Sequence, residues 1–355
     1  MLLATINDTH FGVKNDVQYM LDYQERFYKF VYFPTLLKNG IKNILHGGDI
    51  FDRRKYINYT TLNRTKKMFL DCAREYGMTI DIIPGNHDVA LKNSNEINSL
   101  RELLYGYDNI NIIETPQVKD YEGCKIMFLP WMNGQNHAEF MKFVADNEAD
   151  VLYGHLELSG FEMYAGVKND HGMDAASFTK FSQVWSGHFH HQSKKGNIHY
   201  LGAPMEFTFA DCGDPRGFHL FDTWTRKLEF QENPNKLFEK VYYSDETTEL
   251  QQSWRDHDVE QYADKVVKLF VTKKTNPVLF ESFIDRLYKV NLIDLTIMED
   301  YSEFHESNVD LEIKYNSTKD LMDKYVETAQ TDMDKPRLKT ILNNLYIEAL
   351  HTETR

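Results

Sequence analysis

The sequence has few cysteines and lacks a long apolar run. Its 355 residues include only Cys72, Cys124 and Cys212, which are widely spaced and form no CxxC pair. A disulfide framework or a thiolate zinc site is therefore not expected, and a reducing compartment such as the cytoplasm is. The apolar run at the N-terminus ends at Ile6 and has no basic region before it, so it predicts no signal peptide. No stretch approaches the length of a membrane span, and no membrane partner is expected.

Positive charge is also scarce. The 40 Lys and Arg residues face 54 Asp and Glu residues, which gives a formal net charge of −14. This balance argues against a protein that coats nucleic acid by bulk electrostatic attraction. An acidic protein that acts on nucleic acid must use local basic patches, metal ions or a basic partner. Aromatic residues, by contrast, make up 14% of the chain, and they fit either a packed interior or surfaces that stack on bases.

The length and the order of short patterns predict one large α/β domain followed by smaller units. Apolar, β-branched runs alternate with helical patterns through the first two-thirds of the chain. The expected helices cover residues 21–38 and 61–76, and the expected strands cover residues 2–6, 41–46, 79–83, 126–129, 151–153 and 183–186. We expect this domain to span residues 1–230.

Five of the expected strands end in a polar cluster. The clusters are Asp8-Thr9-His10, Gly48-Asp49, Gly85-Asn86-His87-Asp88, Gly154-His155 and Gly187-His188-Phe189-His190. In open α/β sheets, ligands bind in the crevice beyond the carboxyl ends of the strands. The clusters therefore predict one site at that edge of the sheet.

Each cluster taken alone has an ordinary explanation. A DxH pair is common, Gly-Asp is usual turn chemistry, and Asn-His-Asp in a loop is more often a solvated turn. His155 alone is readily explained as a satisfied histidine at a strand end. The ordered set DxH, GD, GNHD, GH and GHxH within about 190 residues is far more specific than any one of its parts.

This ordered set resembles the signature of the calcineurin-like metallophosphoesterase superfamily. The resemblance implies a layered β-sandwich flanked by helices, with two divalent metal ions at the strand ends. One ion would be held by Asp8, His10 and His190, the other by Asn86, His155 and His188, and Asp49 would bridge both. A set of oxygen and imidazole ligands without thiolate favours Mn²⁺, and iron or zinc less specifically.

The resemblance also implies a mechanism. A hydroxide between the two ions would attack the phosphoester, and the ions would clamp the attacking and leaving oxygens. His87 is not needed as a ligand and would protonate the leaving oxygen or stabilise the charged transition state. Asp52 or Asp88 would orient His87 from behind.

Two motifs indicate the branch of the superfamily. Protein Ser/Thr phosphatases carry GDYVDRG and RGNHE, whereas this chain has GDIFD at Gly48–Asp52 and PGNHD at Pro84–Asp88. These motifs resemble the nuclease branch that contains bacterial SbcD and the eukaryotic meiotic-recombination nuclease. Pro130-Trp131, the VWSGH run at 184–188 and the DPRGF run at 214–218 are similar to the compact viral members, such as the recombination nuclease subunit of T-even phages. The motif-level match covers residues 1–222.

Membership of this branch implies a manganese-dependent DNA nuclease of a recombination or repair complex. It would degrade duplex DNA as a 3′–5′ exonuclease, cut single strands as an endonuclease, and work with an SMC-like ATPase of the SbcC type. A viral member would act in the host cytoplasm. The local basicity that such a function needs is present at Arg53 and Arg54, which directly follow the GDIFD motif and are the expected DNA contacts.

The character of the chain changes after residue 222. Asn233-Pro234-Asn235 indicates a linker, and residues 266–271, 278–290 and 292–297 predict strand, helix and strand. We expect residues 235–300 to form a small α/β capping module for DNA recognition, with a linker and C-terminal helices at 301–355. The apolar spacing there predicts an amphipathic helix that either docks on the coiled coil of the ATPase or packs on its own domain. Its apolar residues are Leu338, Ile341, Leu342, Leu345 and Tyr346.

Two other functions and one assembly stay open. A small-molecule phosphatase or nucleotide phosphodiesterase would use the same ligands, and a non-catalytic scaffold that binds DNA ends would be expected to have lost some of them. The family also forms homodimers through helices of the nuclease domain. Phe27, Phe30, Val31 and Phe33 are candidates for that contact, although a Phe-rich helix is first of all a core element.

Overall fold

The computed structural model describes residues 1–164, 167–169 and 171–299, together with residues 326, 334, 335, 337–339 and 342. Most of the expected C-terminal segment, including Ile341, Leu345 and Tyr346, lies outside the described residues, as does Asp300 at the end of the expected capping module. Within the described part of the chain, no helix is both long enough and apolar enough to cross a lipid bilayer.

Two six-stranded sheets form the centre of the large unit. The first has the order β16-β15-β1-β2-β3-β6, in which β1, β2, β3 and β6 run parallel. Its strands are β1 (Leu2–Ile6), β2 (Asn43–His46), β3 (Thr79–Ile82), β6 (Ile110–Ile112), β15 (Gly217–Asp222) and β16 (Leu228–Glu232). The strands that the sequence predicted at 2–6, 41–46 and 79–83 are all in this sheet.

The second sheet has the order β13-β14-β12-β9-β8-β7, in which β14, β12, β9 and β8 run parallel. Its strands are β7 (Gln117–Tyr121), β8 (Cys124–Leu129), β9 (Val151–His155), β12 (Gln183–Gly187), β13 (Ser193–Lys195) and β14 (Ile198–Tyr200). The strands predicted at 126–129, 151–153 and 183–186 are three adjacent strands here. Two short hairpins, β4 (Val89–Leu91) with β5 (Ser94–Asn98) and β10 (Glu162–Tyr164) with β11 (Val167–Lys168), lie outside the two sheets.

The two sheets pack face to face. Alternate residues of each strand point to opposite faces of its sheet, so one set of side chains lies between the two sheets and the other set faces outward. In β1, Leu3 packs between the sheets while Ala4 faces the helices; in β9, Tyr153 packs between the sheets while Leu152 faces away. The apolar layer between the sheets includes Leu3, Leu45, Ile83, Ile126, Phe128, Val151, Tyr153, Trp185 and Phe221. The layered α/β fold class predicted from the sequence is therefore confirmed.

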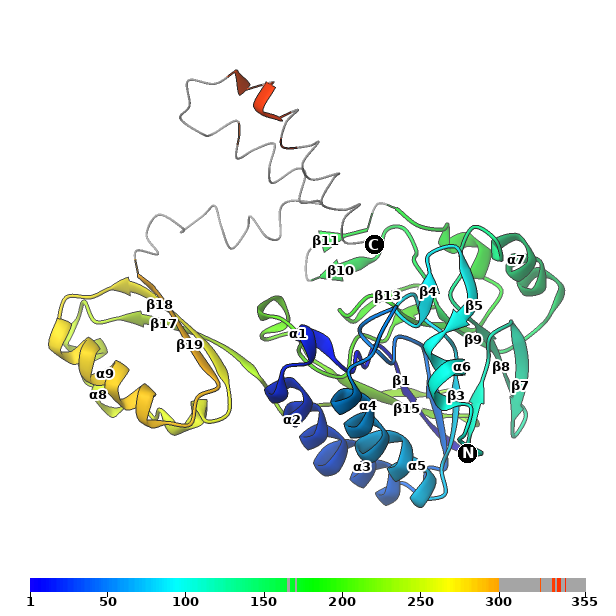
Figure 1. Cartoon of the computed structure of the whole chain (residues 1–355), viewed down its shortest axis with the longest axis horizontal. Helices are drawn as coiled ribbons and strands as arrows, with labels where there is room; N and C mark the ends of the chain where they lie inside the picture. The colour runs from blue at the N-terminus through cyan, green and yellow to red at the C-terminus, as the bar shows by residue number, and fades with distance from the viewer. Residues whose placement is uncertain are drawn as a thin grey trace.

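Helices cover the outer faces of this sandwich (Figure 1). On the first sheet, α2 (Gln18–Phe27) continues through a π-helical turn into α3 (Phe33–Lys38), and α4 (Tyr59–Thr65) continues in the same way into α5 (Asp71–Glu75). These are the two helices predicted at 21–38 and 61–76. The shorter helices are α1 (Val13–Asp16) and α6 (Ser99–Leu104), and α7 (His137–Asp146) packs on the second sheet.

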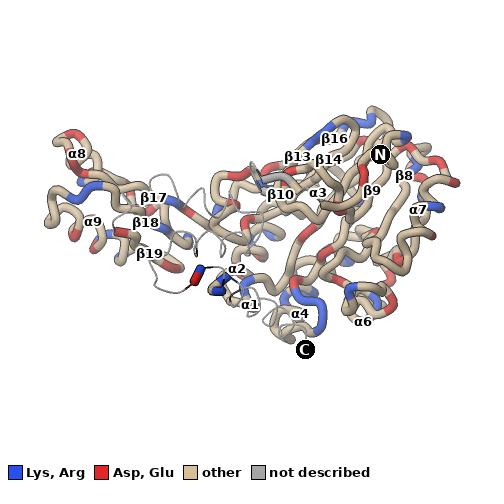
Figure 2. The backbone as a smooth tube through the Cα atoms, turned by 90° about the horizontal axis from the view of Figure 1, so that it is seen from above, with Lys and Arg blue, Asp and Glu red and all other residues tan. Residues whose placement is uncertain are grey.

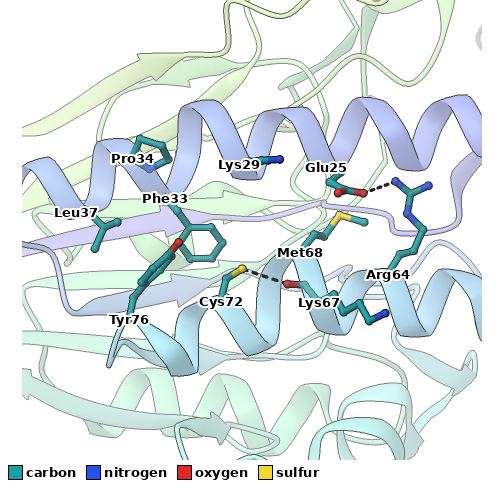
Figure 3. Close-up of a pocket in the computed structure, with 10 residues that line it drawn as sticks. All are labelled: Glu25, Lys29, Phe33, Pro34, Leu37, Arg64, Lys67, Met68, Cys72 and Tyr76. Carbon is teal, nitrogen blue, oxygen red and sulfur yellow. Dashed lines mark hydrogen bonds and ion pairs between the residues drawn. The ribbon is translucent and has the colours of Figure 1, made fainter.

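The outer helices contain the residues that were candidates for the dimer contact. Phe27 and Phe33 are buried in the core beneath the helices, whereas Phe30 is 64% exposed. A groove of about 380 Å³ lies between the α2–α3 and α4–α5 helices, where Glu25 pairs with Arg64 and Cys72 donates to the carbonyl of Lys67 (Figure 3). Among the described residues, none of those predicted for catalysis, metal or DNA binding lines this groove.

A small α/β unit follows the sandwich and stands beside it (Figure 1). Its parallel sheet has the order β17-β18-β19, and two helices cover one face. The elements are β17 (Phe238–Ser244), α8 (Thr248–Asp256), β18 (Val266–Lys273), α9 (Pro277–Lys289) and β19 (Asp294–Glu299). The first strand and helix were not predicted. The unit contacts the sandwich where the Tyr23 hydroxyl donates to the Asn235 carbonyl at 2.9 Å and Arg26 pairs with Asp264 at 3.2 Å.

Candidate metal centre

All seven predicted metal ligands lie together at one edge of the sandwich. Asp8 and His10 follow β1, Asp49 follows β2, and Asn86 follows β3, which are neighbours in the first sheet. His155 ends β9, and His188 and His190 follow β12, its neighbour in the second sheet. Since parallel strands bring their carboxyl ends to the same edge, both sheets deliver ligands to one crevice.

The first group of donors surrounds His10. Its Nε2 lies 3.0 Å from His190 Nε2 and 3.9 Å from an Asp8 carboxylate oxygen. His10 Nε2 also lies 3.7 Å from Asp49 Oδ2. Donor atoms of Asp8, His10 and His190 all lie within 4.8 Å of one another, which is the spacing expected of side chains that share one cation.

The second group surrounds Asn86. Its side-chain oxygen lies 2.9 Å from His155 Nε2 and 2.9 Å from His188 Nδ1. His155 Nε2 is also 3.4 Å from Asp49 Oδ2, the same oxygen that approaches His10. Asp49 therefore lies between the two groups, as the resemblance implies for a bridging carboxylate.

The charges at this edge fit a site for cations. Asp8 and Asp49 are buried carboxylates that face imidazoles from both sheets. Burial lowers the pKa of His155, but the negative charges of Asp49 and Asp8 outweigh burial and raise this pKa to about 9. Burial and the charge of His155 lower the pKa of His188 to about 3, so His188 presents a neutral ring with a free lone pair. The raised pKa of His155 shows that the carboxylates favour positive charge at this edge, and carboxylate oxygens together with imidazole nitrogens are a donor set that suits divalent metal ions.

The backbone at the site adopts uncommon conformations. Asp8, His10, Asp49 and His188 have φ values of 50°, 41°, 56° and 86°, in a region that non-glycine residues rarely occupy. Gly85 allows its own loop to approach the loop that carries Asp49, because a Cβ atom at position 85 would collide with the Asp49 carboxylate. Strain of this kind concentrates at functional sites, where the surrounding structure holds it in place.

Asp88 supports the ligand loops from behind. Its carboxylate accepts hydrogen bonds from the backbone N–H groups of Asp49, Ile50 and Gly85 at 2.7, 3.1 and 2.9 Å. Burial, and then the nearby charge of Asp49, raise the pKa of Asp88 to about 7. The side chain therefore ties the loop that carries Asp49 to the loop that carries Asn86.

His87 is half-buried beside the ligands and points its ring towards His10, with 4.8 Å between ring centroids. Its backbone N–H donates to Asp49 Oδ1 at 2.7 Å, and its Nδ1 lies 2.5 Å from the backbone carbonyl of Asp52. A donated Nδ1–H leaves Nε2 as the other ring nitrogen that can exchange a proton. The Asp52 carboxylate lies instead 3.3 Å from His10 Nδ1. Asp52 thus contacts His87 through its carbonyl oxygen and His10 through its carboxylate.

Two supporting residues carry no signal in the sequence pattern. Asn7 donates to the Asp8 carboxylate at 2.5 Å and to the Gly202 carbonyl at 3.0 Å. Arg216 is 2% exposed, donates to the carbonyl of His190, and pairs with Asp211 and Asp214 at 2.7 and 2.9 Å. Arg216 was noticed only as part of the DPRGF run, because its contact with His190 joins segments that are far apart in the chain.

Four of the seven residues predicted to contact DNA or the partner protein are described. Arg53 pairs with Asp16 at 2.9 Å, donates to Asn15, and stacks over the Tyr56 ring. Arg54 is half-buried in the same basic run. Blue segments, which mark Lys and Arg, lie close to α4 (Figure 2). Of the five residues expected to contact the ATPase, only Leu338 and Leu342 are described, and both are half-buried.

This chain is similar to several known proteins. Residues 1–192 match the family model "Calcineurin-like phosphoesterase". The chain is 32% identical to "Exonuclease subunit 1" of Enterobacteria phage T4 over 356 aligned residues, which cover 98% of this chain and 99% of that protein. A weaker match, 25% identical over 92 residues and 24% of each chain, is the SbcD component of the SbcCD nuclease of Staphylococcus saprophyticus. A solved archaeal phosphodiesterase shares 13% identity over 66% of this chain and all of its own, with a TM-score of 0.34.

Proposed function

Since this chain belongs to the calcineurin-like phosphoesterase family, we propose that it is a manganese-dependent DNA nuclease of a recombination or repair complex. The observation that carries the proposal is that a relative named as an exonuclease subunit matches nearly the whole chain. The proposed activities are 3′–5′ exonuclease action on duplex DNA and endonuclease action on single strands.

The proposed roles follow from the geometry of the side chains. Asp8, His10 and His190 would hold one ion, Asn86, His155 and His188 the other, with Asp49 between them. When bound, two divalent cations supply an activated water and neutralise the charge that develops on the phosphodiester. The oxygen and imidazole donors, without a thiolate, favour Mn²⁺.

His87 would supply the proton for the leaving oxygen. Its main-chain N–H and Nδ1 are both engaged, by Asp49 and by the Asp52 carbonyl, so the ring is fixed with Nε2 available. In the imidazolium form the ring carries a second proton on Nε2, and donating that proton to the leaving alkoxide is general-acid catalysis. Asp88 would act indirectly, by keeping the Asp49 and Asn86 loops in register.

We also propose the assembly that the relatives suggest. Both are named as parts of nucleases, which supports a partner protein, and we propose an SMC-like ATPase that contacts the segment around Leu338 and Leu342. Residues 235–300 would form the DNA-recognition module beside the nuclease domain of residues 1–230, and pairing of two copies through the helical layer would give a homodimer. The cytoplasm is the proposed site of action.

The first experiment incubates the purified chain and Mn²⁺ with end-labelled duplex DNA, beside an Asp49→Asn variant. Cleavage by the natural chain alone, lost with a chelator and restored by Mn²⁺, is the expected result. If neither protein cleaves DNA while the natural chain hydrolyses nucleotides or small phosphoesters, the DNA nuclease proposal is wrong and a small-molecule phosphodiesterase is favoured. Cleavage by both proteins would deny Asp49 its proposed place between the ions.

A further inference from the structure

A small cavity of about 230 Å³ opens beside the second group of ligands. His155 forms part of its wall, together with Trp131, Met132, His137, Glu157 and Met173. Its volume is below the roughly 300–1,000 Å³ of pockets that hold drug-sized ligands, so it suits a single ring system. The cavity therefore directly adjoins the point where a phosphodiester would sit.

The loop that carries Trp131 is firmly held. The backbone N–H of Trp131 donates to the Pro84 carbonyl at 2.9 Å. The backbone carbonyl of Trp131 accepts from the side chains of Asn95 and Asn136 at 2.8 and 3.2 Å. Pro84 begins the PGNHD loop, so these contacts hold the backbone of Trp131 close to the loop that carries Asn86. Its ring centroid lies 5.4 Å from His188 and 5.9 Å from His155.

The part of the wall around Gly172 and Met173 is also held by the backbone. The Met173 N–H donates to the Glu157 carbonyl at 2.8 Å. Gly172 beside it has a φ of +102°, and a Cβ atom there would lie 2.5 Å from that same carbonyl. Only glycine permits this close approach, which brings Met173 against the segment that follows β9.

We propose that this cavity receives the base of the nucleotide whose phosphate is bound at the metal centre. This inference rests on the proposed function, because it names the part of a DNA substrate that the site grips. An indole and two thioethers offer the flat, polarisable surface on which any base can stack. The described residues that line the cavity include a carboxylate, Glu157, and no Lys or Arg, which disfavours a phosphate there.

Glu157, Asn133 and the two histidines, His137 and His155, make the lining partly polar. A carboxylate only accepts hydrogen bonds, so it matches the ring and amino N–H groups found on base edges. Stacking does not depend on base identity, whereas the acceptor favours bases that can donate. The cavity should thus bind all four nucleotides, with a modest preference among them.

The test compares two ligands on the full-length, Mn²⁺-loaded chain by calorimetry: a deoxynucleoside monophosphate and deoxyribose 5-phosphate, which lacks the base. We expect the natural chain to bind the nucleotide about 5- to 100-fold more tightly, the contribution of one stacked base. Trp131→Ala should remove this preference and leave the affinity for deoxyribose 5-phosphate unchanged. Trp224→Ala, which removes an indole that is 79% exposed, is the matched control and should change neither affinity.

Equal affinity of the natural chain for both ligands would overturn the inference. So would an equal loss of both affinities in Trp131→Ala, since that result would make the indole a support for His188 and not a base contact. If Trp131→Ala does not fold, Met173→Ala provides the same comparison. DNA cleavage measured on the same preparation separates the two proposals: base-dependent binding without cleavage overturns only the nuclease function, and cleavage with base-independent binding overturns only the base site.

Discussion

Two buried aspartates, one in each unit of the molecule, show how differently the ends of strands can be used. Asp49 follows β2 of the sandwich, and Asp245 follows β17 of the small unit; both are buried. Asp245 accepts hydrogen bonds from the Tyr243 hydroxyl at 2.9 Å, from the Thr275 N–H and from the Asn276 N–H at 3.0 Å. Its carboxylate thereby ties the start of α9 to the end of β17.

The Asp49 carboxylate, by contrast, faces imidazole rings and lies near another carboxylate. Its Oδ2 faces the rings of His10 and His155 at 3.7 and 3.4 Å, and the Asp8 carboxylate lies in the same cluster. Burial alone would raise the pKa of Asp49, but the imidazoles, led by His155, lower it well below its usual range. A buried carboxylate whose partners are backbone and hydroxyl groups has a structural role, whereas one that shares its surroundings with convergent imidazoles is a candidate ligand. Buried polarity alone does not distinguish the two cases.

The backbone conformations of the two units differ as well. Four candidate ligands in the sandwich occupy positive φ, whereas in the small unit the described residues with positive φ outside glycine are confined to Asp264, which is not a candidate ligand. The small unit gains its stability from an apolar interior around Tyr243, Leu269 and Phe283. Changes at the sandwich edge should therefore affect chemistry with little effect on stability, and changes within the small unit should do the reverse.

The largest expected effect is that of His87→Ser. We expect DNA cleavage to fall about 10²- to 10⁴-fold, because a general acid is lost. Mn²⁺ affinity and the melting temperature should stay the same, since the ring is not among the proposed ligands. Calorimetric titration with Mn²⁺ and a melting curve check this, and a parallel loss of metal binding would mean that His87 is a ligand.

Phe283→Ala is the corresponding change in the small unit. Phe283 is fully buried on the inner face of α9, and its removal should lower the free energy of unfolding by about 3–5 kcal/mol through lost burial and the resulting cavity. Denaturant unfolding measures the loss. Mn²⁺ affinity of the folded protein should be unchanged; a large drop in affinity would show that the two units are energetically coupled and would break the comparison.

Arg216→Lys tests a residue that supports the site without entering it. Lysine keeps the positive charge but cannot reach the His190 carbonyl, Asp211 and Asp214 together as the planar guanidinium does. We expect Mn²⁺ affinity to fall about 10- to 100-fold, as is usual when a group that orients a metal ligand is altered. Unchanged affinity, with a lower melting temperature, would make Arg216 purely structural.

Asp245→Asn should have the smallest effect. The amide keeps one acceptor oxygen but presents an NH₂ group where a carboxylate oxygen accepted two hydrogen bonds, which should cost about 1–3 kcal/mol of stability. Cleavage and Mn²⁺ affinity should not change. An Asp49→Asn variant that behaved in the same way, losing only stability, would remove the distinction between the two aspartates.

The sequence predicted the elements that carry local patterns. The strands of the sandwich that end in polar clusters and the two long helices were found because apolar runs stop abruptly at Gly, Asn or Asp. The strand at 238–244 was missed, since its mixed FEKVYYS composition is typical of a strand only once Val241 and Tyr243 are seen to face α9. Helix α8 was missed because its described buried residue is Trp254 alone, too little for a helical period.

The sequence by itself determined which side chains are available as ligands, because each one lies in a short motif at the end of a strand. The sequence did not determine which of these side chains lie close to one another. Only the tertiary structure placed Asp49 within reach of both His10 and His155, brought Arg216 against the His190 carbonyl, and closed a cavity from Trp131, His155 and Met173. The reason is that strand order within each sheet, and the packing of the two sheets, decide which distant loops meet, and those long-range contacts leave no local pattern in the chain.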